Sequence, residues 1–370
     1  MKILFLTLKT FSATSGIEKV CRLAGKALYE YSKQSNEDFR MYSLYDERKI
    51  KTEPYLPLAV FNGFGRRKFS FVIKSLEQGR KSKVVVLSHM NLLPYGYFIK
   101  LLSPKTKIIL IANSVEGLKP FFISRRRMLK KINLVITVND FIREKIKTVF
   151  YLPEEKFRVL DNCIDPFLPL PPGESRRNEC RSSYAIAEND LVLMTLNRLY
   201  SNEKSKGYDK VLIAVKKLQA SFPNIKYLFV GKYEAEERIR LDNIILDLGI
   251  EDAVIFTDFV PDAVLADFYN MSDVYIMPGD KEGYGFHFIN ALYYGKPVIA
   301  GRSGGVSDSR YGDNLGTLTD LRSQEDITTT IQKVMSNPKA FMPDRKLVME
   351  KFGYAVFKDK WKQVLDEVEG

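Results

Sequence analysis

Short apolar segments alternate with amphipathic helical patterns along two separate stretches of this chain, and this alternation constrains its fold more than any other feature. The first stretch has candidate strands at residues 2–8, 39–44, 83–88, 107–112, 134–138 and 157–160, and an amphipathic pattern at 17–34. The second has candidate strands at 190–196, 225–231, 253–259, 272–278 and 296–301, and helical patterns at 208–222, 235–249, 262–271 and 285–294. Strands separated by helices are typical of parallel sheets that are covered on both faces. The sequence therefore predicts two α/β domains.

A segment rich in proline and charge, residues 165–183, separates the two stretches and is typical of a linker. We expect an N-terminal domain at 1–165, a linker at 166–189, a C-terminal domain at 190–350, and a helix at 351–370 that crosses back to the N-terminal domain. Ligands of such sheets bind beyond the carboxyl ends of the strands, so we expect the site in a cleft between the two halves.

Composition places the chain among soluble globular proteins. Hydrophobic residues make up 45% and charged residues 28%, and no apolar run approaches the length of a membrane span. Lys9 interrupts the first apolar segment too early for a secretory signal. Three widely spaced cysteines, Cys21, Cys163 and Cys180, indicate free thiols in a reducing compartment. We therefore expect a cytoplasmic protein.

The net charge of +12 is concentrated in the first half of the chain. Residues 1–165 hold 31 Lys and Arg against 15 Asp and Glu, whereas residues 166–370 hold 26 against 30. A basic half favours an anionic partner, such as a membrane surface. Residues 119–132, which read KPFFISRRRMLKKI, combine phenylalanine with a cluster of basic residues and are a candidate for this contact. An ordinary solvated helix with its phenylalanines packed inward explains the segment equally well.

The stretch Glu282–Gly305, EGYGFHFINALYYGKPVIAGRSGG, predicts a loop, a helix and a buried strand. The loop follows the strand at 272–278, and the helix begins near Gly285 and stops at Gly295. A helix N-terminus approached through glycines offers free N–H groups and a positive dipole end to a phosphate. The carboxylate of Glu282 is better suited to the hydroxyl groups of a sugar attached to that phosphate.

Two basic residues are candidates to complete a diphosphate site. Arg198 and Lys206 follow the strand at 190–196, so they lie in another loop at the carboxyl edge of the sheet. An arginine can bind a diphosphate with two parallel hydrogen bonds, and a lysine provides a compact charge.

These segments together resemble the family 4 retaining glycosyltransferases of the GT-B fold. The resemblance runs in order through SGIEKV, LDNCID, NRL with KGYDKVLIAV, YLFVG and SDVYIMPGDKEGYGFHFINALYYGKPVIAGRSGG. It implies two Rossmann-like domains whose parallel sheets face each other across a deep cleft. It also implies transfer of a sugar from a nucleotide-diphosphate donor, expected to be a UDP-sugar, with retention of configuration and without a metal or other cofactor. The acceptor would be a glycan or a lipid-linked saccharide in bacterial surface polysaccharide synthesis, such as that of lipopolysaccharide or capsule.

The resemblance also implies roles for individual residues. Arg198, Lys206 and Glu282 would be catalytic, the first two by holding the diphosphate and the third by contacting the donor sugar. The expected donor-binding set is Gly16, Arg198, Lys206, Phe259, Val260, Glu282, Gly283, Tyr284, Gly285, Phe286 and Asn290. The expected acceptor-side residues are Ser15, His89 and Asn113.

The sequence departs from the family pattern at three positions. The second family acid, which binds the nucleotide ribose in relatives, is Asn290 here; an amide can still bond to hydroxyl groups, but without charge assistance. A histidine that often follows the fourth strand is Asn113, and the usual glycine before Arg198 is Asn197. We therefore expect Asn290 to play the role of the second acid with weaker donor binding.

Two alternatives stay open, and two other classes lack their sequence signatures. A GT-B enzyme could act on a soluble acceptor, as a synthase or phosphorylase does, and a non-enzymatic nucleotide-binding α/β protein would share the pattern. A nicotinamide-dependent oxidoreductase would need Gly-x-Gly-x-x-Gly after the first strand, which the sequence lacks. We expect no nucleic-acid partner, because no zinc-ligand, helix-turn-helix or aromatic-basic sheet signature accompanies the charge.

Overall fold

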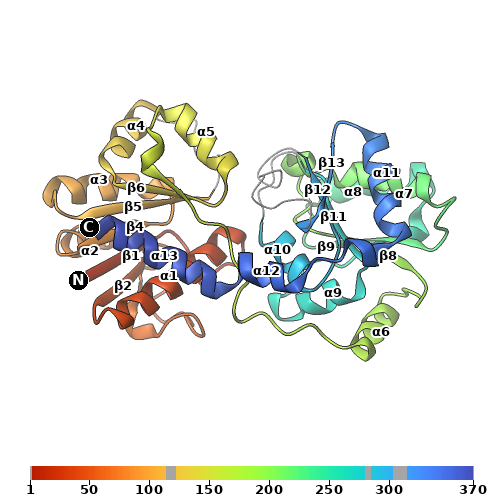
Figure 1. The fold of residues 1–370 in the computed structure, drawn as a ribbon, viewed down its shortest axis with the longest axis horizontal. Coiled ribbons are helices and arrows are strands. Elements are labelled where there is room, and N and C mark those ends of the chain that lie inside the picture. The colour runs from red at the N-terminus through yellow and green to blue at the C-terminus, as the bar shows by residue number, and fades with distance from the viewer. Residues whose placement is uncertain (1, 114–121, 280–284, 303–314, 370) are drawn as a thin grey trace. The chain divides into compact units, whose positions relative to one another are not determined.

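The computed structural model describes residues 2–113, 122–279, 285–302 and 315–369, which form two separate α/β units (Figure 1). Unit 1 comprises residues 1–165 and 354–370, and unit 2 comprises residues 166–353. No helix among these residues is long and apolar enough to cross a membrane.

Unit 1 is built on a seven-stranded sheet in which every neighbouring pair is parallel, in the order β3-β2-β1-β4-β5-β6-β7. The strands are β1 (Lys2–Thr7), β2 (Asp38–Ser43), β3 (Phe61–Gly63), β4 (Val84–Leu87), β5 (Lys107–Ala112), β6 (Leu134–Thr137) and β7 (Phe157–Val159). The helices are α1 (Gly16–Gln34), α2 (Lys68–Gly79), α3 (Leu93–Leu102), α4 (Phe122–Lys131), α5 (Asp140–Phe150) and α13 (Tyr354–Glu369).

Helices cover both faces of this sheet. Helices α2, α3, α4 and α5 share one hydrophobic core, which contains Phe71, Ile99, Leu129 and Ile146. The C-terminal helix α13 packs against α1, and the Tyr31 hydroxyl donates to the Asp366 carboxylate at 2.9 Å (Figure 1). The C-terminal helix therefore belongs to unit 1, although the chain reaches it only after it has built unit 2.

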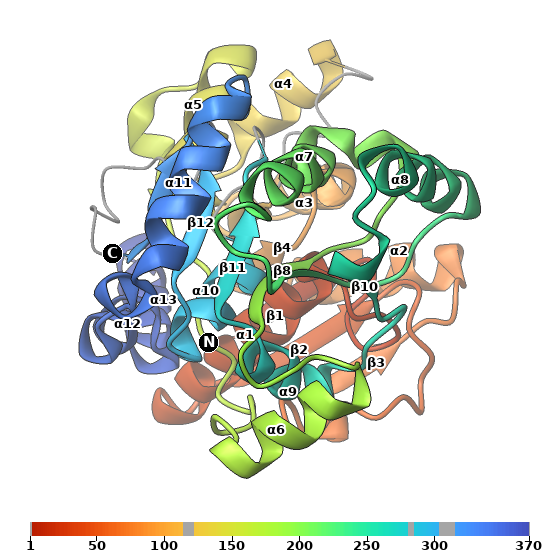
Figure 2. The same cartoon turned by 90° about the vertical axis from the view of Figure 1, so that its right-hand side faces the viewer.

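Unit 2 repeats this plan with a six-stranded parallel sheet in the order β10-β9-β8-β11-β12-β13. The strands are β8 (Leu191–Leu196), β9 (Ile225–Val230), β10 (Val254–Phe256), β11 (Val274–Met277), β12 (Val298–Gly301) and β13 (Thr317–Thr319). The helices are α6 (Glu174–Ser183), α7 (Tyr208–Leu218), α8 (Ala235–Leu248), α9 (Leu265–Met271), α10 (Phe286–Tyr293), α11 (Gln324–Ser336) and α12 (Arg345–Phe352). Helices α7, α8 and α11 cover one face, and α9, α10 and α12 lie on the other side (Figure 2).

The predicted fold class, two Rossmann-like domains with parallel sheets, is confirmed. Each strand range predicted from the sequence holds a strand, and both sheets follow the doubly wound order in which the second and third strands lie on one side of the first and the fourth lies on the other. The short strands β3 and β13 were not predicted. The segment predicted as a linker, 166–189, contains the ordered helix α6.

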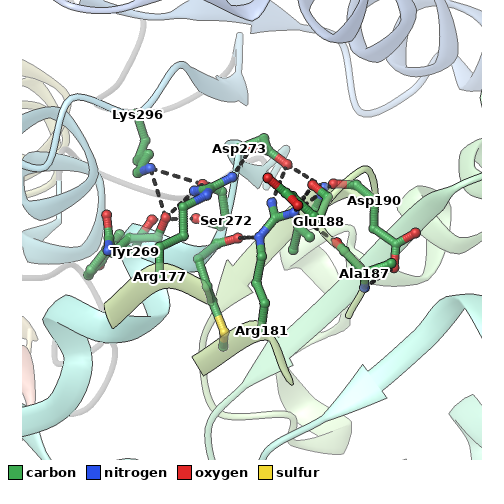
Figure 3. A network of polar contacts seen from close by, with 12 residues as sticks. Arg177, Arg181, Ala187, Glu188, Asp190, Tyr269, Ser272, Asp273 and Lys296 are labelled. Atoms are coloured by element: carbon green, nitrogen blue, oxygen red, sulfur yellow. Dashed lines mark hydrogen bonds and ion pairs between the residues drawn. The ribbon is translucent and has the colours of Figure 1, made fainter. Parts of the chain in front are cut away.

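Helix α6 is fixed to unit 2 by buried charges rather than by apolar side chains (Figure 3). The side chain of Arg181 is nearly inaccessible to solvent and donates to the Asp273 carboxylate at 2.9 Å. The same guanidinium donates to four main-chain carbonyls, those of Met271, Ala187, Glu188 and Asp190, at 3.0–3.1 Å. Arg177 donates to the other Asp273 oxygen at 2.6 Å. The side of α6 that faces the rest of unit 2 is therefore held by the hydrogen bonds of Arg181 and Arg177.

Lys296 extends this network from the start of β12. Its ammonium donates to the carbonyls of Asn270 at 3.2 Å and Ser272 at 2.9 Å. Burial lowers the pKa of Lys296 to about 8, and the neighbouring Arg177 charge acts in the same direction. The negative charge of Asp273 raises the pKa of Lys296 and so opposes this shift. Asp273 also accepts from Arg177 and Arg181, so it is the shared counter-charge of these three basic residues.

We predict that Arg181→Ala lowers the free energy of unfolding by about 3 kcal/mol, because it leaves several buried acceptors unpaired. Urea unfolding followed by far-UV circular dichroism measures this change. The matched control is Arg176→Ala, on the same helix, whose half-exposed side chain pairs with Asp267 and should contribute about 0–1 kcal/mol. Equal losses in the two variants would contradict the assigned role of Arg181.

Candidate functional site

The strand order of unit 2 brings the two predicted donor-binding loops together. Strands β8 and β11 are hydrogen-bonded neighbours, and the strand order reverses between them. The loop after β8 carries Arg198 and Lys206, and the loop after β11 begins at Pro278. At Gly207, where φ is +76°, a Cβ atom would lie 3.1 Å from Pro278 and 2.3 Å from Leu321. The two loops therefore pack directly against each other at the position where open α/β sheets bind ligands.

Asn197, which replaces the glycine of the family pattern, has a defined partner in this structure. Its side-chain oxygen accepts a hydrogen bond from the Lys206 ammonium at 2.5 Å. Its main-chain N–H donates to Val230, so the side chain projects from the first residue beyond β8. Arg198, the next residue, is exposed, and its guanidinium lies 5.4 Å from the centre of the Tyr200 ring. Asn197 therefore orients one of the two basic residues predicted to bind the diphosphate.

Helix α10 begins where the sequence predicted it. Gly285 is the N-cap and Phe286 the first helical residue, so no side chain at the N-cap position satisfies the first N–H groups. Glu282, Gly283 and Tyr284, which were expected to contact the donor, lie outside the described residues. The structure therefore places the helix N-terminus but not the carboxylate expected in front of it.

Asn290 lies on α10 with only 2% of its surface exposed. Its side-chain oxygen is buried and has no hydrogen-bond partner among the described residues. Burial raises the pKa of the neighbouring Tyr269 well above its usual value, and a hydrogen bond with the Asn290 side chain acts in the opposite direction. The Tyr269 hydroxyl donates to the carbonyl of His287 at 3.0 Å. Within the part of the chain that the structure describes, the Asn290 oxygen on α10 thus has no donor, and a ligand hydroxyl group would satisfy it.

Phe259 and Val260 follow β10, two strands away from β8. The Phe259 ring is half-exposed, and the ammonium of Lys232 lies 5.2 Å from its centre. Val260 is 9% exposed. An exposed aromatic ring beside a lysine offers a flat surface for a nucleobase.

The candidate residues of unit 1 lie at the carboxyl edge of its own sheet. Ser15 is the N-cap of α1 and its hydroxyl donates to Glu18, while Gly16 is the first helical residue. His89 follows β4, and its Nδ1 accepts from the N–H of Asn91 at 3.0 Å. Burial lowers the pKa of His89, and the charge of Arg125 lowers it further, so its imidazole is predominantly neutral at pH 7. Asn113 follows β5 and donates weakly to the Ser88 carbonyl at 3.5 Å.

Asp46 and Arg22, which sequence reasoning missed, fix the loop that follows β1. Asp46 is fully buried and accepts from the N–H groups of Thr10 at 2.7 Å and Ser12 at 2.9 Å, and from the Ser43 hydroxyl at 2.7 Å. Arg22 is 7% exposed and donates to the carbonyls of Thr10 at 3.0 Å and Ala13 at 2.9 Å. In the backbone that leads to Ser15 and Gly16, the carboxylate thus pairs with N–H groups and the guanidinium pairs with carbonyl groups. Their wide sequence separation, with Asp46 after the second strand and Arg22 inside a helix, gave no local signal.

Metal-binding geometry is absent from the part of the chain that the structure describes. Within residues 2–113, 122–279, 285–302 and 315–369, no group of three or more His, Cys, Asp or Glu side chains is arranged to hold an ion. At the β8–β11 edge of unit 2, Arg198, Lys206 and the N-terminus of α10 are described sources of positive charge for an anionic ligand.

Comparison with known proteins identifies relatives for both the sequence and the fold. Residues 176–351, somewhat less than half of the chain, match the family described as glycosyl transferases group 1. The GDP-mannose-dependent alpha-(1-6)-phosphatidylinositol monomannoside mannosyltransferase of Mycolicibacterium smegmatis is 28% identical over 223 residues, which cover 58% of this chain and 56% of that protein. The chain thus spans little more than half the length of this curated relative.

Solved structures share the fold of the whole chain. Anabaena Alr3699/HepE, crystallised in complex with UDP and glucose, superposes with a TM-score of 0.76 over 99% of this chain and 100% of that one, at 18% identity. The lipopolysaccharide outer core galactosyltransferase WaaB, in its apo form, gives a TM-score of 0.71 over 99% of this chain and 99% of that one, at 15% identity. The GT-B class of fold expected from the sequence agrees with these neighbours.

We predict that Asp46→Ala lowers the free energy of unfolding of unit 1 by about 3 kcal/mol, because the N–H groups of Thr10 and Ser12 lose their buried acceptor. The only tryptophan, Trp361, is buried in α13 of unit 1, so its fluorescence during urea unfolding measures the change. Hydrogen exchange at Thr10 and Ser12 should accelerate in the same variant.

Asp38→Ala is the control, because Asp38 is an exposed carboxylate at the start of β2. It should leave both the unfolding transition and the exchange of the two amides unchanged. Normal protection of Thr10 and Ser12 in Asp46→Ala would show that the loop does not depend on this carboxylate.

Proposed function

We propose that the protein is a retaining glycosyltransferase that transfers a sugar from a nucleotide-diphosphate donor to a saccharide acceptor. The observation that carries this proposal is the packing of the Arg198–Lys206 loop against the loop before α10 at the β8–β11 switch point. The match of residues 176–351 to glycosyl transferases group 1 supports it, since that range includes both loops.

The donor occupies unit 2 in this proposal. Arg198 and Lys206 bind the diphosphate together with the N–H groups at the start of α10. Glu282 binds hydroxyl groups of the donor sugar, and the side-chain oxygen of Asn290 accepts from the ribose. The exposed Phe259 ring and the Val260 backbone support the base. We favour UDP as the nucleotide of the donor, since Alr3699/HepE was crystallised with UDP. GDP is the other candidate, because the relative from Mycolicibacterium smegmatis is GDP-mannose-dependent.

The reaction depends on stabilising a departing nucleoside diphosphate. Fixed positive charge at Arg198, Lys206 and the α10 N-terminus stabilises the negative charge that develops on the leaving phosphate. Glu282 orients the sugar for attack from the face of the leaving group, which retains the configuration. An oxygen of the β-phosphate accepts the proton of the attacking hydroxyl. The side chains thus supply the required charge, and we propose that no metal ion is needed.

The acceptor occupies unit 1, next to Ser15, His89 and Asn113. The basic character of residues 1–165 suits an acceptor that carries phosphate, such as a lipid-linked saccharide used for bacterial surface polysaccharide. The enzyme would then act at the cytoplasmic face of the membrane. Of the segment 119–132 predicted to contact lipid, residues 122–131 form the basic helix α4, and residues 119–121 lie outside the described residues.

Titration calorimetry with UDP and with GDP tests the donor site. We expect micromolar binding of one nucleotide that does not change when EDTA is added. Lys206→Ala should weaken binding about 10- to 100-fold, because it removes a charge-assisted hydrogen bond to phosphate. Asn290→Ala should weaken it about 3- to 10-fold, because a neutral amide contributes less.

Lys217→Ala is the matched control, because Lys217 is exposed on α7 in the same unit and away from the switch point. It should bind nucleotide as the wild type does. Glu282→Ala should leave nucleotide affinity close to that of the wild type and weaken binding of the nucleotide sugar. If the wild-type protein binds neither nucleotide, the proposed donor site is wrong.

A further inference from the structure

Helices α2 and α3 expose five large apolar side chains, which we call the α2–α3 apolar face. Its members are Phe69, Ile73, Phe98, Leu101 and Leu102, whose exposed fractions lie between 52% and 88%. Single exposed apolar side chains are normal on a protein surface, but a contiguous group marks an interaction site. The proposed glycosyl transfer does not account for this group.

The helical spacing shows that these side chains point away from the sheet. On α2, Phe69 and Ile73 are four residues apart and therefore share a stripe, whereas Phe71 and Ser75 on the opposite stripe are fully buried. On α3, the buried stripe contains Leu93 and Ile99. Phe98, Leu101 and Leu102 are related by steps of three and four residues on its other side.

The two helices pack side by side, so the outward stripes form one surface. The rings of Phe71 and Tyr95 meet edge to face at a centroid distance of 5.3 Å. Near the end of α2, a Cβ on Gly79 would lie 2.4 Å from the Ile99 side chain, so glycine permits the close approach. Helix α4 packs against α3 in turn, which places α3 between α2 and α4 (Figure 1).

Positive charge surrounds this apolar surface. Residues 64–133 contain sixteen Lys and Arg and only two acidic residues, Glu77 and Glu116. Glu77 is paired with Lys74 at 3.1 Å and with Lys81 at 3.3 Å, and this single carboxylate leaves a large net positive charge on the segment. Exposed basic residues lie on both helices that flank α3, among them Lys68 and Lys74 on α2 and Arg127, Lys130 and Lys131 on α4. Helix α13, on the other face of the sheet, has three basic and four acidic residues between 354 and 370.

We propose that the α2–α3 apolar face inserts into an anionic phospholipid membrane while the basic residues of α2 and α4 bind the lipid headgroups. Apolar side chains ringed by lysine and arginine match the two layers of such a membrane. A second copy of the chain is a poor occupant, because two strongly positive faces would repel each other. The proposal deepens the proposed function, since it explains how unit 1 reaches a lipid-linked acceptor, and it moves the apolar part of the contact from 119–132 to α2 and α3.

Flotation of the purified protein with vesicles tests the proposal. Vesicles of phosphatidylcholine with about 30% phosphatidylglycerol should bind the wild-type protein, and vesicles of phosphatidylcholine alone should bind it at least about 10-fold more weakly. Phe98→Ser/Leu102→Ser and Phe69→Ser/Ile73→Ser should each reduce binding to the anionic vesicles about 10-fold or more. Raising the salt concentration to about 0.5 M should weaken the wild-type interaction, because it screens the basic residues.

Ile239→Ser/Leu246→Ser is the matched control, because both side chains are exposed to a similar degree on α8 of unit 2. It should bind vesicles as the wild type does. Circular dichroism and the nucleotide titration confirm that each variant is folded, and vesicle binding should persist in Lys206→Ala, so a failed donor site cannot be mistaken for a failed membrane contact. Wild-type vesicle binding by the two α2–α3 variants would overturn the proposal. So would a wild-type protein that does not bind anionic vesicles, or variants that change only its self-association.

Discussion

The parallel pairing of β8 with β11 is the contact on which the proposed donor site depends. Because these strands are neighbours and run in the same direction, the loops that leave their carboxyl ends must emerge side by side. The pairing of the strands thus brings together chain segments that are about eighty residues apart in the sequence. Gly207 then allows the two loops to touch, since any larger residue there would collide with Leu321 and crowd Pro278. The sheet thus fixes where the two loops lie, and the side chains of the loops supply the positive charge of the proposed donor site.

In both units, buried charged side chains form hydrogen bonds with irregular backbone next to the sheet. Apolar side chains could not replace them, because they cannot form hydrogen bonds. In unit 1, Asp46 and Arg22 satisfy the N–H and carbonyl groups of residues 10–13 at the carboxyl edge, where a ligand is expected. In unit 2, Arg181 satisfies carbonyls before β8 and β11, at the amino edge of the sheet, and holds α6. The first arrangement shapes a loop that is proposed to bind substrate, and the second anchors a connection. The chemistry is the same in both, because a buried loop must find partners for every backbone group.

The sequence allowed the sheets to be predicted but not every element around them. Strand β4 is a fully apolar run and β8 is apolar except for Thr195, and polar residues bound both, so their burial follows largely from composition. The strands β3 and β13 are three residues long and each forms one edge of its sheet, where pairing rather than apolar content defines them. Helix α6 escaped prediction because its buried contact is made by Arg181, and arginine in a proline-rich segment is typical of a linker.

The candidate site could be predicted in part for the same physical reason. Arg198, Lys206 and Gly285 directly follow or precede strong apolar elements, so their place at the sheet edge was evident. The hydrogen bond from Lys206 to Asn197 was not, because it depends on the fold of the loop between them. The α2–α3 apolar face was missed because helical periodicity shows that apolar residues recur, not which stripe faces the sheet: Phe69 and Phe71 have the same side chain but are 88% and 0% exposed.

The distribution of charge separates the two proposed interactions. Residues 166–353, which form unit 2, hold 23 Lys and Arg against 26 Asp and Glu, so unit 2 has no positive overall field to attract a diphosphate. The proposed donor site instead uses local positive charge, from Arg198, Lys206 and the dipole of α10. Residues 64–113 and 122–133 show the opposite arrangement, because their fifteen Lys and Arg are spread over several elements and Glu77 is the one acidic residue among them. A compact charge suits a small ligand of fixed geometry, whereas a diffuse one suits a fluid anionic surface, because lipid headgroups can rearrange to meet it.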